Sequence, residues 1–244
     1  ALMLIPLSRE SGYEFDEIKS ALEDQGGYEV KRIIGDDVKP EDFKELHNYS
    51  VDFVDTHGDY WTDSSGEEWC RLTTFEHFTP DYYIDNYDDF HNGRLIRNWR
   101  GIVHEKPFVA VTQRYIDKYN DKYDNCLLYV SACNQLSNGA LSGAVNKPGF
   151  MALIGFSRYG EFVPRFGRML GIPPTPDEQA AVEFFKLATG ENKTVRSAFD
   201  ESKGITKPGL DLKEYYSSGH QFYLNYKHTG KASRDSGCRR SGPG

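Results

Sequence analysis

Two short segments of the sequence combine residue types that support thiol chemistry. His57 and Gly58 follow the strand-like segment SVDFVDT at residues 50–56, and Cys133 follows the apolar run at residues 126–132. A thiol becomes an effective nucleophile when an imidazole within hydrogen-bond reach takes its proton. If folding brings the two segments together, Cys133 would attack an acyl carbon to form a thioester that water then hydrolyses. His57 would act first as general base and later as acid.

Gly58 has a physical role in this hypothesis. Because a glycine has no side chain, its backbone N–H can face a reacting carbonyl beside the base. The N–H of Cys133 would be the second donor of an oxyanion hole. The sequence therefore predicts three catalytic positions, namely His57, Cys133 and Gly58.

The elements around these segments alternate between strands and helices. Hydrophobic patterns predict strands at residues 1–7, 28–34, 50–56, 126–132, 150–156 and 221–226, and helices at 15–25, from Pro40, at 115–123, 175–190 and 194–203. The helix at 175–190 has a capping box, with Thr175 as N-cap, Pro176 at N1 and Glu178 at N3. This alternation predicts an α/β fold with a mostly parallel sheet of about six strands and helices on both faces. Ligands bind such sheets at the carboxyl ends of the strands, where His57 and Cys133 are expected to meet.

A strand that closes on His-Gly, followed by a strand that closes on Ala-Cys, resembles the caspase-like (clan CD) cysteine peptidases. LLYVSACNQ is similar to the cysteine strand of CHAT domains, and THGDYW is similar to the His-Gly loop of gingipain-type enzymes. The likeness covers residues 1 to about 59 and about 122 to 203. It implies a caspase-like three-layer sandwich and a peptidase with a His57–Cys133 dyad that selects the residue before the cleaved bond.

The residues that would read the substrate are less regular. Several relatives have an acidic or amide side chain two residues before the cysteine, where this chain has Ser131. After the strand at 150–156, Glu161 would pair with a basic substrate side chain, whereas Arg158 would favour an acidic one. We expect a preference for Lys or Arg before the cleaved bond.

The domain organisation is simple. Residues 1–232 are expected to form one peptidase domain, interrupted by a Tyr-, Asp- and Trp-rich insertion at about 60–111 that includes a hairpin near residues 98–111. Residues 233–244 are expected to be a flexible tail. Because the chain opens directly on an apolar run and stops in a polar stretch, we expect it to be part of a longer protein.

Composition limits the partners. The formal net charge of −8 gives no electrostatic reason to bind nucleic acid, and no apolar run approaches the roughly 20 residues that span a bilayer. Four cysteines could form two disulfides in a secreted protein, but they are widely spaced and form no CxxC pair, so a zinc site or redox motif has little support, and we expect a thiol at Cys133 rather than a disulfide. The expected partner is a protein or peptide substrate, and the chemistry requires no cofactor.

Three alternatives remain open at this point. Asp55-x-His57-Gly58 also occurs where two-metal phosphatases begin their site, although the later ligand motifs are missing. Four acidic residues of the insertion, Asp81, Asp85, Asp88 and Asp89, offer oxygen ligands for a structural calcium, although their spacing is not that of an EF-hand and a solvated loop would look the same. The fold without activity would be a non-catalytic interaction or signalling module.

Overall fold

The computed structural model describes residues 1–6, 13–63, 65–98, 107–123, 126–136, 139–157, 173–190 and 193–205, and the backbone of 212–216, 222–223 and 239–240. Its central sheet has six strands in the order β10-β9-β8-β3-β1-β2. Their bounds are Leu2–Ile5 (β1), Lys31–Ile34 (β2), Val51–Asp55 (β3), Cys126–Ser131 (β8), Phe150–Phe156 (β9) and Leu212–Tyr216 (β10). All neighbouring pairs are parallel except β9 and β10, which run antiparallel. The predicted α/β class and mostly parallel sheet are confirmed.

Helices cover one face of the central sheet. They are α1 (Tyr13–Ser20), continued by the π-helical turn η1 (Ala21–Gln25), α7 (Pro176–Gly190) and α8 (Val195–Lys203). Alternate strand residues, among them Phe53 and Tyr129, point into this layer and share a buried core with the helices. The predicted capping box of α7 is confirmed, because the Glu178 N–H donates to Thr175 Oγ1 at 3.3 Å and the Thr175 N–H donates to Glu178 Oε2 at 2.6 Å.

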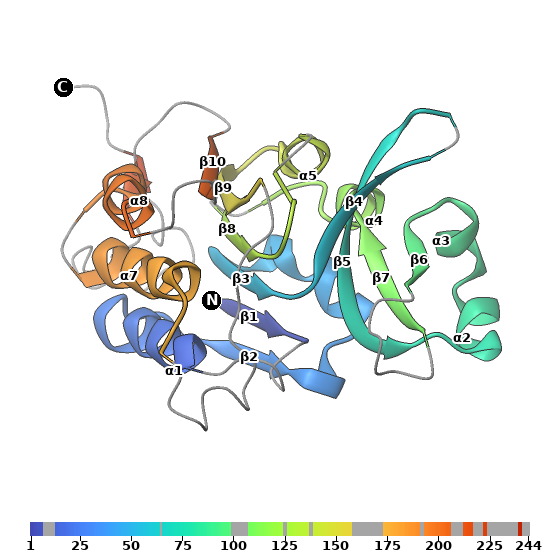
Figure 1. The fold of residues 1–244 in the computed structure, drawn as a ribbon, viewed down its shortest axis with the longest axis horizontal. Helices are drawn as coiled ribbons and strands as arrows, with labels where there is room; N and C mark the ends of the chain where they lie inside the picture. Colours follow the sequence, from blue (N-terminus) through green and yellow to red (C-terminus); the bar gives the residue numbers. More distant parts are fainter. Residues whose placement is uncertain are drawn as a thin grey trace.

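The opposite face is covered by α4 (Gln113–Tyr119), α5 (Ala140–Val145) and a second sheet (Figure 1). This second sheet is antiparallel, with the order β4-β5-β7-β6, and consists of Gly58–Thr62 (β4), Glu68–His77 (β5), Leu95–Asn98 (β6) and Phe108–Thr112 (β7). Leu72 and Val111 of this sheet share one buried core with Leu128 and Val130 of the central sheet. The region predicted as an insertion is therefore built into the core, and its β6–β7 pair is the expected hairpin.

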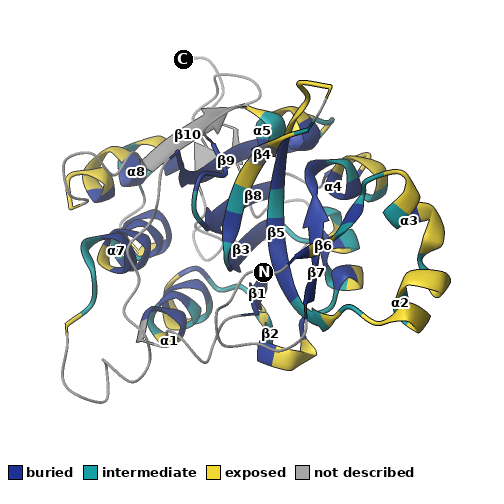
Figure 2. Ribbon diagram, turned by 45° about the vertical axis from the view of Figure 1, so that its right-hand side comes forward, coloured by how far each residue is buried: buried dark blue, intermediate teal, exposed yellow. Residues whose placement is uncertain are grey.

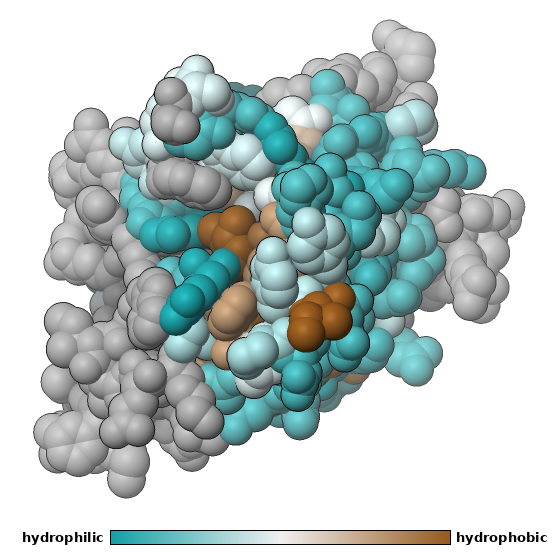
Figure 3. Space-filling model, turned by 90° about the vertical axis from the view of Figure 1, so that its right-hand side faces the viewer, coloured by the Kyte–Doolittle hydropathy of each residue, from teal (hydrophilic) through white to brown (hydrophobic). Residues whose placement is uncertain are grey.

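The outer part of the second sheet carries the short helices α2 (Pro80–Asp85) and α3 (Tyr87–His91). Figure 2 shows these helices mostly exposed, in contrast to the buried strands beside them. The side of the molecule that carries them is mainly hydrophilic, with apolar residues only in small groups among the described atoms (Figure 3). Within the described ranges, no helix is both long enough and apolar enough to cross a membrane.

Local differences from the sequence predictions have physical causes. The helix expected from Pro40 is instead two 3-10 helices, η3 (Pro40–Lys44) and η4 (Leu46–Asn48), which follow a further 3-10 turn, η2 (Gly35–Asp37). The Asn120 side chain accepts a hydrogen bond from the His47 N–H at 3.0 Å, so this donor is not available to an α-helix.

The hydrophobic pattern predicted the last strand at residues 221–226, but the last strand of the central sheet lies earlier in the chain. The edge strand is β10, whereas within the predicted strand at 221–226 only β11 (Phe222–Tyr223) is described as a strand. β11 pairs with β12 (Arg239–Arg240) in a separate two-stranded sheet, and β12 lies within the predicted tail.

Candidate active site

The pairing of β3 with β8 brings the two predicted loops to the same edge of the sheet. The strands are parallel, with Asp55 opposite Ser131, and the Thr56 N–H continues the ladder by donating to the Ser131 carbonyl at 3.1 Å. His57 and Cys133 each lie two residues beyond the last pair, Asp55 and Ser131. The register thus places the imidazole and the thiol on neighbouring strand ends, as the sequence predicted.

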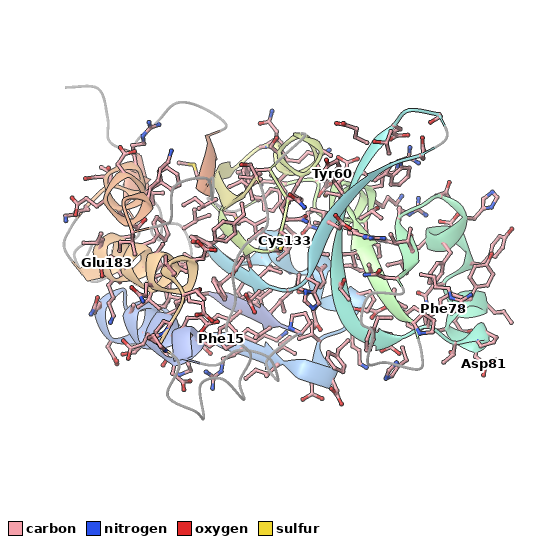
Figure 4. The ribbon with its side chains drawn as sticks, in the orientation of Figure 1. Phe15, Tyr60, Phe78, Asp81, Cys133 and Glu183 are labelled. Carbon is pink, nitrogen blue, oxygen red and sulfur yellow. The ribbon has the colours of Figure 1, made fainter. Side chains whose placement is uncertain are left out.

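Gly58 shows how closely the two loops approach. A Cβ atom at Gly58 would lie 2.5 Å from the carbonyl oxygen of Cys133, 2.3 Å from Nε2 of Gln135 and 2.9 Å from Cβ of Ala132. These distances are shorter than van der Waals contact, so a side chain at this position would push the loops apart. Figure 4 shows Cys133 in the middle of the molecule, near the start of β4. The contact between backbones explains why this position carries glycine.

The loop after the nucleophile candidate turns sharply. Asn134 has a φ of 60°, the left-handed region that asparagine tolerates better than most residues. The chain then returns to the sheet, where the Leu136 N–H donates to the Phe156 carbonyl at 3.0 Å. This turn leaves Cys133 between two segments that are both fixed by backbone hydrogen bonds.

The cysteines differ in accessibility. Cys70, Cys126 and Cys133 are free thiols, and Cys238 lies outside the described residues. Cys70 is buried, and burial raises its pKa to about 12. Cys126 is also buried and its Sγ lies 2.9 Å from Asp52 Oδ2. Cys133 is half-buried, as is His57, so among the described thiols it is the one that a reagent reaches most easily.

Strand β5 holds both loops. The Thr73 N–H donates to the His57 carbonyl at 3.0 Å. Two residues earlier on the same strand, the Arg71 carbonyl accepts from Nε2 of Gln135 at 3.3 Å, and the same nitrogen donates to the Cys133 carbonyl at 2.9 Å. Sequence patterns missed Gln135, because a single polar residue after a strand gives no periodic signal and its partner Arg71 is distant in the chain.

The charges next to the site offset each other. Asp59 follows Gly58 on β4, and its Oδ2 lies 3.0 Å from Nη2 of Arg71 on the paired strand β5. Thr56 adds a neutral contact, since its hydroxyl donates to the Thr73 carbonyl at 2.5 Å. These contacts tie β4 and β5 to the end of β3 without leaving a net charge on the pair.

The predicted substrate-reading residues are only partly placed. Ser131 is 6% exposed, opposite Asp55 at the end of the ladder. Glu161 and Arg158 lie outside the described residues, so the structure does not relate them to His57 or Cys133.

Two of the four acidic residues considered for calcium, Asp88 and Asp89, have protein partners. Asp88 and Asp89 both bind Arg94, and Asp89 also accepts a hydrogen bond from the Tyr119 hydroxyl at 2.9 Å. Across the described part of the chain, no three His, Cys, Asp or Glu side chains lie together as a metal site.

Comparisons with known proteins add no assignment. The chain matches no family model, no curated protein and no solved structure. The fold and the site define an α/β protein with a thiol and an imidazole at adjoining strand ends. Further assignment depends on the chemistry of that site.

Proposed function

We propose that the protein is a cysteine endopeptidase of the caspase-like kind, with Cys133 as nucleophile and His57 as general base. The observation that carries the proposal is the parallel β3–β8 register together with the direct contact of Gly58 with the Cys133 backbone. His57 and Cys133, both half-buried, adjoin this contact at the edge of the sheet where α/β proteins bind ligands. The resemblance of THGDYW and LLYVSACNQ to caspase-like segments supports the same function.

The proposed reaction proceeds in two stages. His57 takes the Cys133 proton as the sulfur attacks the scissile carbonyl, and the imidazolium then protonates the amine as the C–N bond breaks. Water attacks the resulting thioester with His57 again as base, and the thiol is restored when the acid product leaves. In this proposal the backbone N–H groups of Gly58 and Cys133 stabilise the oxyanion in both stages.

Substrate selection is the finer part of the proposal. We expect Lys or Arg before the cleaved bond if Glu161 reaches the first pocket, and an acidic residue if Arg158 does. Arg71 and Asp59 offset each other, so neither supplies a single uncompensated charge for recognition. Selection by charge would therefore come from the segment that holds Glu161 and Arg158.

Profiling a peptide library tests the function. The wild type is expected to cleave peptides, and His57→Ala is expected to lose this activity. His47→Ala is the matched control, because His47 is also half-buried but bonds to Asn120 rather than lying at the β3–β8 strand ends. Cleavage after Lys or Arg supports the proposed preference, and cleavage after Asp or Glu would reverse it.

The non-catalytic module is the rival function, and the same experiment separates the two. If the folded wild type cleaves no library peptide, and His57→Ala behaves identically, the peptidase proposal is wrong and the module is favoured. Activity that survives in His57→Ala but is lost in His47→Ala would also contradict the assignment of the base.

A further inference from the structure

The buried amide of Gln135 lies in the loop that contains the candidate nucleophile and bonds to the Cys133 carbonyl. Gln135 is 0% exposed, although glutamine is a residue that proteins usually leave in water. Burial favours an amide whose polar atoms are hydrogen-bonded, and here Nε2 has two partners, whereas Oε1 has none among the described residues. The contacts of Gln135 therefore indicate what it does.

Both hydrogen bonds of the Gln135 Nε2 group go to backbone carbonyls on different segments. One acceptor is Cys133, at 2.9 Å, and the other is Arg71 on β5, at 3.3 Å. The amide nitrogen fills the space where a side chain on residue 58 would be, only 2.3 Å from the ideal Cβ position of Gly58. Gln135 thus connects the cysteine loop, the start of β4 and the middle of β5.

Strand β5 also holds the base. The Thr73 N–H donates to the His57 carbonyl at 3.0 Å, so positions 71 and 73 of one strand fix the backbones of both candidate catalytic residues. Because one strand makes both bonds, loss of the Gln135–Arg71 bond would release the Cys133 loop from the strand that fixes the His57 backbone. A hydrophobic residue of the same size would fill the space but would not hold the loop in register.

We infer that Gln135 is a positioning residue, which sets the Cys133 loop against His57 through β5. The inference rests on the proposed function, since it concerns the geometry of that dyad. It also assigns a role to the second sheet, which then acts as the frame of the site.

The test compares two glutamines that bond to the backbone of the same strand, β5. Gln135→Met removes the donor and keeps the volume. Gln113→Met is the matched control, because Gln113 is 8% exposed and its side-chain hydrogen bonds go to the β5 backbone at Cys70 and Glu68 rather than to the cysteine loop. For each protein, the rate of Cys133 labelling by a peptidyl vinyl sulfone is measured from pH 5 to 10, and thermal unfolding is measured in parallel.

We expect Gln135→Met to label at least about tenfold more slowly at neutral pH, since small displacements of a reacting group have large effects on rate. Its labelling should also rise only at higher pH, as for a cysteine in an unstructured peptide. Gln113→Met should lose as much thermal stability and keep the wild-type pH profile. If Gln135→Met fails to fold, the isosteric Gln135→Glu replaces it, with the same expectation above pH 6.

The outcomes are distinct. Equal pH profiles for the wild type and the folded Gln135 variant overturn the inference while leaving the peptidase proposal intact. A shift of the same size in Gln113→Met also overturns it, because the effect would then be a general loosening of β5. If the wild type itself labels no differently from His57→Ala, the proposed function fails instead.

Discussion

Strands β3 and β8 have a cysteine near each end of their shared ladder, in opposite environments. At the amino end, Cys126 is buried and lies 2.9 Å from the Asp52 carboxyl group, which is also fully buried. At the carboxyl end, Cys133 is half-buried, and its backbone meets Gly58 next to His57. The same two strands therefore have one buried thiol beside an acid and one half-buried thiol at a strand end adjoining that of His57.

The difference shows that location in the sheet, rather than residue type, decides which thiol can do chemistry. At the amino end of the ladder, Cys126 packs with Tyr123 in the core that the second sheet shares with the central sheet. The carboxyl end opens into loops, as parallel sheets generally do where they bind ligands.

Replacing each of the two cysteines by alanine, one at a time, should give the largest effect. Cys133→Ala should lower peptide hydrolysis by more than about a hundredfold, because only binding and oxyanion contacts would remain. Cys126→Ala should keep the activity within a few fold and lower thermal stability, since it leaves Asp52 without its Sγ partner. The measurement is kcat/KM on one library-derived peptide with melting curves, and a comparable loss in both variants would contradict the contrast.

Adding one methyl group at the carboxyl end should have the next largest effect. In Gly58→Ala the new Cβ meets the Cys133 carbonyl and Gln135, so we expect a loss of stability of about 1–3 kcal/mol and a clear loss of activity. Gly143→Ala on α5 is the control, because its Cβ would meet nothing within 4 Å and should stabilise the helix by about 0.5–1 kcal/mol. Urea unfolding measures both, and a fully active, stable Gly58→Ala would show that the loops do not touch as described.

At the amino end of the β3–β8 ladder, titration of Asp52 should affect the stability of the protein but not its peptidase activity. Burial raises the pKa of Asp52 well above its ordinary value of 3.8. Between 3.8 and that raised value the folded state binds more protons than the unfolded state, so wild-type stability falls as pH rises through this interval. Asp52→Asn removes this titration, and the stability of the variant relative to the wild type should therefore increase with pH.

Denaturant unfolding of both proteins at several pH values between 3.5 and 8 measures this effect. Peptidase activity at neutral pH should change little in Asp52→Asn, since the residue is remote from the carboxyl edge. A relative stability that is flat with pH would mean that Asp52 ionises normally in the folded protein.

Much of this contrast could be predicted from the sequence because it depends on local patterns. The hydrophobic patterns before His57 and Cys133 predicted both strands, and the parallel class of sheet then predicted that their ends lie together. The capping box at Thr175 likewise depends on residues that are close in the chain.

The parts that were missed depend on contacts between distant segments. Gln135 meets Arg71 only after β4 and β5 have folded onto the central sheet, so no pattern near either residue reveals the bond. The second sheet lies in the region predicted as an insertion, and its sharing of a core with the central sheet through Leu72 and Val111 is not visible in local patterns. The edge strand β10 was missed for a related reason, because its pairing with β9 decides its conformation.

The most direct test of the central claim is the alkylation rate of each cysteine at neutral pH, read by peptide mapping in the wild type and in His57→Ala. We predict that Cys133 reacts at least about tenfold faster than Cys70 and Cys126, and that most of this advantage is lost in His57→Ala while the other rates stay the same. Exposure alone would favour Cys133 equally in both proteins. An unchanged Cys133 rate in folded His57→Ala would therefore contradict the dyad.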